Sequence, residues 1–221
     1  MNELLFLLHI VVIFICTLGC LKKGKEFLVI WICLQVILAN LFVLKQVMLF
    51  GFQVTCSDAF AVGGVLGLNL LQQYHGKQQA KSAINACFCF MLLFTILAQI
   101  HLLYSPSQDD IAHTSYAALL SPSPRLFFTS LFVFFVVQKI DVALFSSLKK
   151  APIFARNLIC LSTSQLLDTI LFTFIGLYGL IAAPLDVIFV SFFIKITAIT
   201  LLSPSVWVAQ KFIPLNKELH A

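Results

Sequence analysis

Charged residues are scarce in this sequence. Only 10% of its 221 residues are Asp, Glu, Lys or Arg, whereas soluble domains average about 25%. Hydrophobic residues make up 61% of the chain, and 23 residues are phenylalanine. A soluble core of this size has no room for so much apolar surface, whereas a lipid bilayer can contact it directly. We therefore predict an integral membrane protein.

The sequence also lacks the motifs of several functional classes. It contains no HExxH zinc motif and no GxSxG nucleophile elbow, so we predict that the protein is not an enzyme. The five histidines share no metal-ligand spacing, and most of the seven cysteines lie inside apolar runs, where they fit as small buried side chains. No cofactor or metal is therefore expected. No single element concentrates basic residues, which argues against nucleic-acid binding.

Long apolar runs predict an all-α, polytopic membrane helix bundle. A membrane barrel would need alternating polarity over segments of about ten residues, but runs such as Leu126–Val137 are apolar throughout. We predict one transmembrane domain over residues 1–221, with a polar stretch at Ser105–Pro124. Each helix should have near the roughly 20 residues that cross a bilayer. The seven predicted segments are about Leu4–Leu21, Phe27–Phe50, Val54–Leu71, Ala83–Tyr104, Arg125–Leu148, Asn157–Ala182 and Leu185–Leu202.

The basic residues predict the orientation of these helices. Lys45, Lys139 and Lys195 lie inside predicted segments, and Arg125 lies beside the acidic loops. The other ten lie after the first, third and fifth segments and in the tail: Lys22, Lys23, Lys25, Lys77, Lys81, Lys149, Lys150, Arg156, Lys211 and Lys217. Cytoplasmic loops are enriched in Lys and Arg, so this alternation predicts seven helices, an external N-terminus and a cytoplasmic C-terminus. Six or eight helices would break the pattern.

Polar side chains recur at helical spacing inside the apolar segments. A charged side chain at mid-bilayer costs about 2.5–3.5 kcal/mol, so its presence usually has a functional reason. Asp58 begins the third segment, and Lys195 lies in the middle of the seventh. The polar faces of the third, fifth and sixth segments comprise Asn69, Gln72 and Gln73; Gln138, Asp141 and Phe145; and Gln165, Asp168, Thr169 and Phe172.

These faces predict a site for a flat, polar, purine-like solute. Carboxylates and carboxamides can hydrogen-bond the edge of a planar heterocycle, and aromatic rings can cover its face. The alternative is that the polar groups join helices to one another, with Lys195 as the counter-ion of Asp168. Ala59, Gly63 and Gly67 recur every four residues, a spacing of small residues that predicts close packing against another helix.

Three of these stretches resemble the queuosine precursor transporters, a family also described as vitamin uptake transporters. They are Asn69–Ala80 (NLLQQYHGKQQA), Arg125–Leu148 (R-x4-S-x7-Q-x2-D-x3-F-x2-L) and Ser164–Gly179 (SQLLDTILFTFIGLYG). The resemblance implies import of a 7-deazaguanine base such as queuine, 7-aminomethyl-7-deazaguanine or 7-cyano-7-deazaguanine, for salvage into tRNA queuosine. It also implies the bacterial inner membrane. The six-helix core, residues 27–213, would resemble the substrate-binding subunit of energy-coupling-factor vitamin transporters, with residues 4–21 as an extra N-terminal helix.

The resemblance also implies which residues line the substrate cavity. Matching positions carry over Arg125, Gln138, Asp141, Gln165, Asp168 and Lys195. The chain departs from the family pattern at Asn69 and Gln73, where the family usually has carboxylates. In our interpretation Asp168 and Gln165 hold the base edge, Phe172 packs on it, and Gln138 and Asp141 line the cytoplasmic side.

Several alternatives remain at this point. The chain could capture another vitamin and depend on a separate ATPase module, and either such an energising partner or a second copy of the chain could bind it. The amines of 7-aminomethyl-7-deazaguanine and queuine should carry a positive charge, which Asp58 or Asp168 could pair with. A purely structural membrane subunit would leave the matching motif spacings unexplained.

Overall fold

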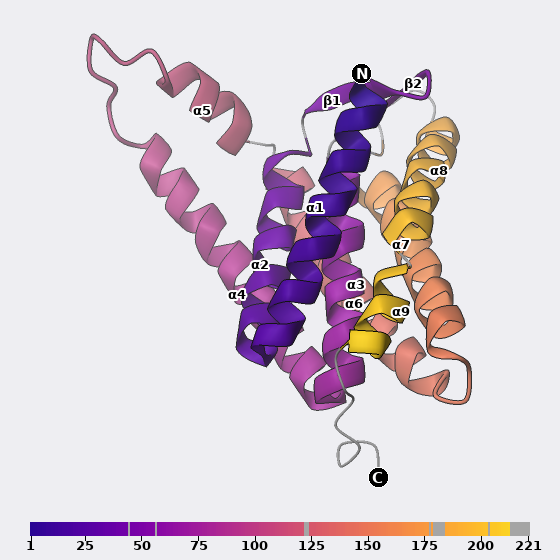
Figure 1. Cartoon of the computed structure of the whole chain (residues 1–221). Helices are drawn as coiled ribbons and strands as arrows, with labels where there is room; N and C mark the ends of the chain where they lie inside the picture. The colour runs from indigo at the N-terminus through magenta and orange to yellow at the C-terminus, as the bar shows by residue number, and fades with distance from the viewer. Residues whose placement is uncertain are drawn as a thin grey trace.

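The computed structural model describes residues 1–43, 45–55, 57–121, 124–176, 178, 184–202 and 204–212. Within these ranges the chain is mainly helical, as predicted, and the long helices lie side by side in one bundle (Figure 1). The long helices are α1 (Asn2–Lys23), α2 (Lys25–Leu41), α3 (Asp58–His75), α4 (Lys77–Leu102), α6 (Pro124–Ser147), α7 (Ile153–Gly176) and α8 (Pro184–Leu202). Shorter elements are β1 (Gln46–Leu49), β2 (Phe52–Thr55), α5 (His113–Leu120) and α9 (Pro204–Phe212).

Five stretches of the described chain are long and apolar enough to cross a membrane. They are α1, α4, α7, residues Phe128–Ser147 of α6, and the stretch Ile188–Phe212 that covers most of α8 and α9. The exposed side chains of these helices are largely apolar, including Leu4, Leu8, Leu97 and Phe189. Such a surface is suited to lipid and not to water. The chain is therefore a multi-pass membrane protein, as the composition predicts.

Helix α3 is the central helix of the bundle. Fourteen of its 18 residues are buried, and it contacts α1, α2, α4, α6, α7 and α8. A Cβ atom on Gly63 would lie 2.8 Å from Ile13 Cγ2, and one on Gly67 would lie 2.9 Å from Ile32 Cγ1. Since these separations are shorter than a carbon–carbon contact allows, glycine is what lets α1 and α2 approach α3. The close packing predicted for Gly63 and Gly67 is confirmed.

The second predicted segment is wrong in its second half. Helix α2 ends at Leu41, and the rest of Phe27–Phe50 leads into a β-hairpin in which Leu49 pairs with Phe52. Phe50 and Gly51, at the turn, have φ angles of 51° and 81°. Two successive positive φ angles are typical of a type I′ turn, whose twist matches that of the strands. The hairpin lies at the N-terminal end of α1 (Figure 1), where Asn2 Nδ2 donates to the Met48 carbonyl at 3.0 Å.

Other boundaries also differ from the prediction. The third helix begins at Asp58, because Val54 belongs to β2. The polar stretch Ser105–Pro124 contains the short helix α5, while Ala182 falls outside the described residues. Arg156, predicted in a loop, lies in the first turn of α7, where its backbone N–H donates to the Pro152 carbonyl at 2.9 Å.

Candidate functional site

Six of the predicted site residues are buried inside the bundle: Asp58 and Lys195, described below, and four others. Asn69 and Asp141 are 0% exposed, Gln165 is 2% exposed and Gln138 is 7% exposed. They come from the central helix α3 and from its neighbours α6 and α7. Their side chains therefore point toward other helices and away from the bundle surface, as helical spacing predicts.

Three of these residues carry polar atoms without a hydrogen-bond partner in the described part of the chain. Asp141 Oδ1 accepts a 2.5 Å hydrogen bond from the Ser164 hydroxyl, whereas its Oδ2 has no partner. Both amide atoms of Asn69 and Oε1 of Gln165 are also unpaired. An unpaired polar atom in a buried position costs about 1–3 kcal/mol, so such atoms are uncommon unless they bind something.

Neighbouring contacts connect the helices that carry these residues. Gln72 Nε2 donates to the Val142 carbonyl at 3.1 Å and to Ser146 Oγ at 2.8 Å. Asn69 lies about one helical turn before Gln72 on α3, and Asp141 directly precedes Val142 on α6. Asn69 and Asp141 therefore lie at similar positions along the bundle axis. Gln165 follows Ser164, the partner of Asp141, on α7.

A second polar cluster joins α3, α7 and α8. Lys195 Nζ lies 2.8 Å from Asp168 Oδ2 and 3.9 Å from Asp58 Oδ1. It also donates to Thr169 Oγ1 at 3.1 Å. Lys195 and Asp58 are 4% and 5% exposed, while the Asp168 side chain is 33% exposed. The predicted role of Lys195 as the counter-ion of Asp168 is confirmed.

Gln73 takes part in a third cluster, at the opposite end of α3 from Asp58. Arg156 Nη1 donates to Gln73 Oε1 at 2.8 Å, and Arg156 Nε donates to the Phe145 carbonyl at 2.6 Å. The guanidinium carbon also lies 3.5 Å from the centroid of the Phe145 ring, so cation–π attraction adds to the hydrogen bonds. The Arg156 guanidinium thus ties α7 to α3 and α6.

The remaining predicted residues are less directly linked to these clusters. Phe172 is half-buried on α7, one turn before Gly176, where α7 packs against Thr129 of α6. Arg125 belongs to the first turn of α6, but its side chain lies outside what the structure describes.

The sequence did not single out several buried polar residues. Ser164 is part of a matching stretch, and its contact with Asp141 could have been suspected from their positions on adjacent helices. Gln35 of α2 is fully buried against Gly63, with both side-chain amide atoms unpaired in the described structure. Its polar character inside an apolar segment was the available signal. The sequence gave no sign that Arg156 is buried, because a basic residue near the start of a membrane helix is also expected in a cytoplasmic loop.

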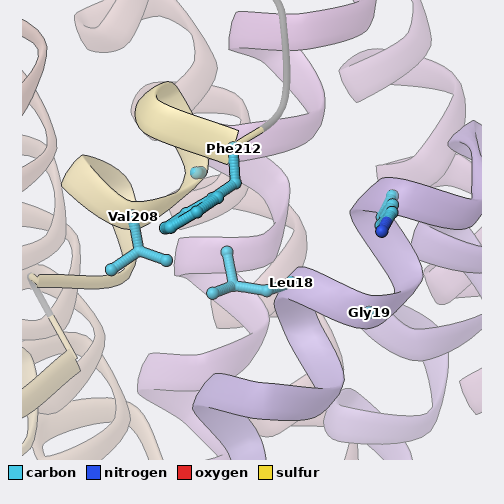
Figure 2. A pocket seen from close by; sticks show the side chains of 6 residues that line it. Leu18, Gly19, Val208 and Phe212 are labelled. Carbon is cyan, nitrogen blue, oxygen red and sulfur yellow. The ribbon is translucent and has the colours of Figure 1, made fainter.

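A groove of about 220 Å³ between α1 and α9 is lined by Leu18, Gly19, Lys22, Val208, Ala209 and Phe212 (Figure 2). Its lining is apolar apart from Lys22, and it includes none of the predicted site residues. In the described chain, no three His, Cys, Asp or Glu side chains group as metal ligands. Among the described residues, the buried side-chain atoms without a hydrogen-bond partner lie on α2, α3, α6 and α7.

Comparison with known proteins agrees with a transport role. The profile of the family described as "Putative vitamin uptake transporter" matches residues 60–209, which include α4, α5, α6, α7 and α8 and most of α3 and α9. A protein of Bacillus subtilis (strain 168) named "Probable queuosine precursor transporter" is 31% identical over 200 residues, covering 86% of each chain. No solved structure matches. The chain belongs to the vitamin uptake transporter family, in which it is similar to a queuosine precursor transporter.

Proposed function

We propose that this chain imports a queuosine precursor, a 7-deazaguanine base, across the bacterial inner membrane, and that it catalyses no reaction. The name of the Bacillus subtilis relative supports this substrate class. The observation that carries the proposal is that Asp141, Asn69 and Gln165, on the adjoining helices α6, α3 and α7, each carry a buried polar atom without a partner.

The chemistry of these atoms suits the edge of a guanine-like base. Such a base presents two adjacent N–H donors, which a carboxylate accepts well, beside a carbonyl oxygen, which an amide N–H can reach. Asp141 fits the first role because its Oδ2 is free, and the Asn69 amide fits the second. Asp168 is already bound to Lys195. We therefore assign the base edge to Asp141, and place Gln165, Gln138 and Phe172 around the ring.

The orientation proposed from charge is supported by the arrangement of helices. We propose that α1, α2, α3, α4, α6, α7 and α8 all cross the bilayer, with the N-terminus outside and the C-terminus in the cytoplasm. Figure 1 shows the N-terminus, the hairpin and α5 at one end of the bundle, and the α1–α2 and α3–α4 joints at the other. The basic residues Lys22, Lys23, Lys77, Lys81, Lys149 and Lys150 lie at or beside the joints of this second end.

Uptake by a salvage-dependent bacterium tests the proposal. A strain that cannot synthesise 7-deazaguanines and lacks its own importer is given each base with or without this gene, and tRNA queuosine is measured. We expect the gene to restore tRNA queuosine from an external base. Glu26→Gln, a carboxylate-to-amide change at an exposed residue of α2, serves as the control and should also restore it. Unrestored queuosine with each base, despite membrane expression, would refute the proposal.

A second candidate follows from the family's description as vitamin uptake transporters. In this alternative the core from α2 to α9 captures another vitamin, as in energy-coupling-factor substrate-binding subunits, and a separate ATPase supplies energy. The two candidate functions differ in whether the purified chain, without an ATPase module, is sufficient for uptake. Base uptake by liposomes containing only this chain supports the first, while uptake that requires an added ATPase module supports the second.

A further inference from the structure

The Asp58–Lys195–Asp168 cluster has an imbalance of charge. It contains two carboxylates and one ammonium, which sum to one negative charge when all three are ionised. Lys195 sits close to Asp168, at 2.8 Å, and farther from Asp58, at 3.9 Å. The unbalanced charge therefore falls mainly on Asp58, which is only 5% exposed.

An uncompensated charge inside a membrane bundle is expensive, so such a group usually gains a partner or loses its charge. Ions such as Ca²⁺ and Mg²⁺ take about six or more oxygen ligands, but Lys195 occupies the space between the two acids. A proton needs a single carboxylate oxygen and no rearrangement of Lys195. One proton on Asp58 would therefore balance the charge of this cluster.

We propose that Asp58 binds one proton in each transport cycle and so couples import of the base to the proton gradient. This proposal rests on the function proposed above. The proton binds a carboxylate oxygen of Asp58 from the outside and is released from the same oxygen toward the cytoplasm, and no other bond changes. The Asp168 side chain is 33% exposed, so the cluster is not completely enclosed by protein.

Protonation would change which carboxylate holds Lys195. While Asp58 is protonated, Lys195 stays with Asp168 and Thr169, as in this structure. Once Asp58 is ionised, it competes for the ammonium, which shifts α8 relative to α3 and α7. Asp168 and Lys195 are the charged groups facing Asp58 from α7 and α8. On the α1 side, the His9 ring packs on Phe60, two residues from Asp58, with 4.3 Å between ring centroids.

The test measures protons moved per molecule of base in liposomes that contain the purified full chain. Radiolabelled 7-aminomethyl-7-deazaguanine reports base uptake, and a pH-sensitive dye inside the liposomes reports proton uptake. We expect about one proton per base for the unmodified chain, and a protonophore should abolish accumulation. Asp58→Asn balances the cluster without a proton, so its ratio should fall close to zero. Glu26→Gln should keep the ratio of the unmodified chain.

Each outcome bears on the proposal. Base uptake without protons in the unmodified chain, or an unchanged ratio in Asp58→Asn, overturns proton coupling but leaves the transport function standing. Asp58→Asn could instead stop importing the aminomethyl base while it still imports 7-cyano-7-deazaguanine with an unchanged number of protons per base. That result would overturn proton coupling through Asp58 and assign Asp58 to recognition of the amine. If the variant is too slow, proton uptake on base binding is measured in weakly buffered detergent, where Asp58→Asn should take up none and Asp58→Glu should behave like the unmodified chain. Absence of base uptake in every chain refutes the transport function itself.

Discussion

At the scale of single residues, the two intramembrane acids of α6 and α7 have different partners. Asp168 is held by an ammonium, whereas the described partner of Asp141 is the neutral hydroxyl of Ser164. A carboxylate with a free oxygen can accept further donors, while one bound to lysine has less capacity to do so. This difference is why we place the base edge at Asp141.

Replacing Asp141 by Asn should weaken transport with little change in the bundle's shape, because the amide keeps the size of the carboxylate. Losing an ionised acceptor for the base N–H groups costs about 1.5–3 kcal/mol. The KM for base uptake should therefore rise by about 10- to 100-fold, measured by initial uptake rates across base concentrations. Glu26→Gln, the matched control, should leave KM unchanged. An Asp141→Asn chain with the same KM would remove Asp141 from the site.

Arg156 provides a second prediction at this scale. Gln73→Glu should be tolerated and should raise thermal stability, since Arg156 Nη1 already lies 2.8 Å from Gln73 Oε1. Hydrogen bonds between charged groups are roughly twice as strong as neutral ones. Arg156→Lys should lower stability, because lysine cannot reproduce both the guanidinium hydrogen bonds and the stacking on Phe145. Melting temperatures of the two purified variants in detergent should move in opposite directions, and a shift in the same direction would contradict this reading of the cluster.

The contacts of a single residue could be predicted from the sequence where its charge is unusual for the apolar segment that contains it. Lys195 and Asp168 stand out in apolar helices, so their pairing could be predicted and is seen at 2.8 Å. Asp58 was also predicted as a site residue, but its approach to Lys195 depends on how α3 and α8 pack, which the sequence does not specify. Arg156 was assigned to a loop because a basic residue four positions after Pro152 is compatible with both a loop and a first helical turn.

At the scale of elements, α3 owes its central position to its small residues. Gly63 faces Ile13 of α1 and Gln35 of α2, while Gly67 faces Ile32 of α2. On another side, Gln72 of α3 hydrogen-bonds to Val142 and Ser146 of α6. The spacing of these glycines predicted the close packing, but not which helices would be packed against α3.

Gly63→Ala should destabilise the bundle, because the added Cβ would meet Ile13 Cγ2 at 2.8 Å. Overpacking of this kind costs about 1–3 kcal/mol, which corresponds to a fall in melting temperature of roughly 2–10 °C. The matched control is Gly19→Ala in α1, where an added Cβ meets nothing within 4 Å. Thermal unfolding in detergent compares the two. Equal melting temperatures for both variants would contradict the packing of α1 and α2 on α3.

The contact between α2 and α4 can be tested with their own cysteines. Cys33 Sγ and Cys87 Sγ lie 3.2 Å apart, and both thiols are buried and free. A membrane-permeant oxidant should therefore join them, since a disulfide needs only a small approach to about 2.04 Å. Mass spectrometry of digested protein should identify the Cys33–Cys87 peptide, which Cys33→Ser removes. Preferential linkage of Cys33 to Cys89 would show that α4 is rotated.

The β-hairpin shows where sequence patterns fail at this scale. The apolar residues Val47–Phe50 follow the apolar run of α2 after Lys45 and Gln46, and a short apolar run does not distinguish a buried helix end from a strand. The turn at Phe50 and Gly51 offered a single glycine as a signal. Lys45, which lies between α2 and β1, was consequently placed inside a helix that ends before it.

At the scale of the whole molecule, each of the seven predicted segments overlaps one of the long helices described in the structure. Length and hydropathy identify five membrane-crossing stretches among the described residues, and α2 and α3 are not among them, so the crossing of the bilayer by all seven stays a prediction. The short helices α5 and α9 were not predicted, since neither has a run of bilayer length. The arrangement of the long helices around α3 could not be predicted because it depends on packing between segments distant in sequence.

The proposed topology is tested by labelling single cysteines in a chain whose own cysteines are replaced. Asp109→Cys lies between α4 and α5 and should react with a membrane-impermeant maleimide on intact cells. Lys149→Cys lies between α6 and α7 and should react only after the membrane is permeabilised. Labelling of both sites, or of neither, on intact cells would contradict the single proposed crossing, by α6, between the two sites.

The most direct measurement is a density map of the purified chain with bound 7-aminomethyl-7-deazaguanine. We expect a flat density between α3, α6 and α7, with the base N–H edge within hydrogen-bond distance of Asp141 Oδ2 and the Asn69 amide beside it. A base that binds elsewhere, such as in the groove between α1 and α9, or saturating ligand that leaves no density near Asp141, would contradict it.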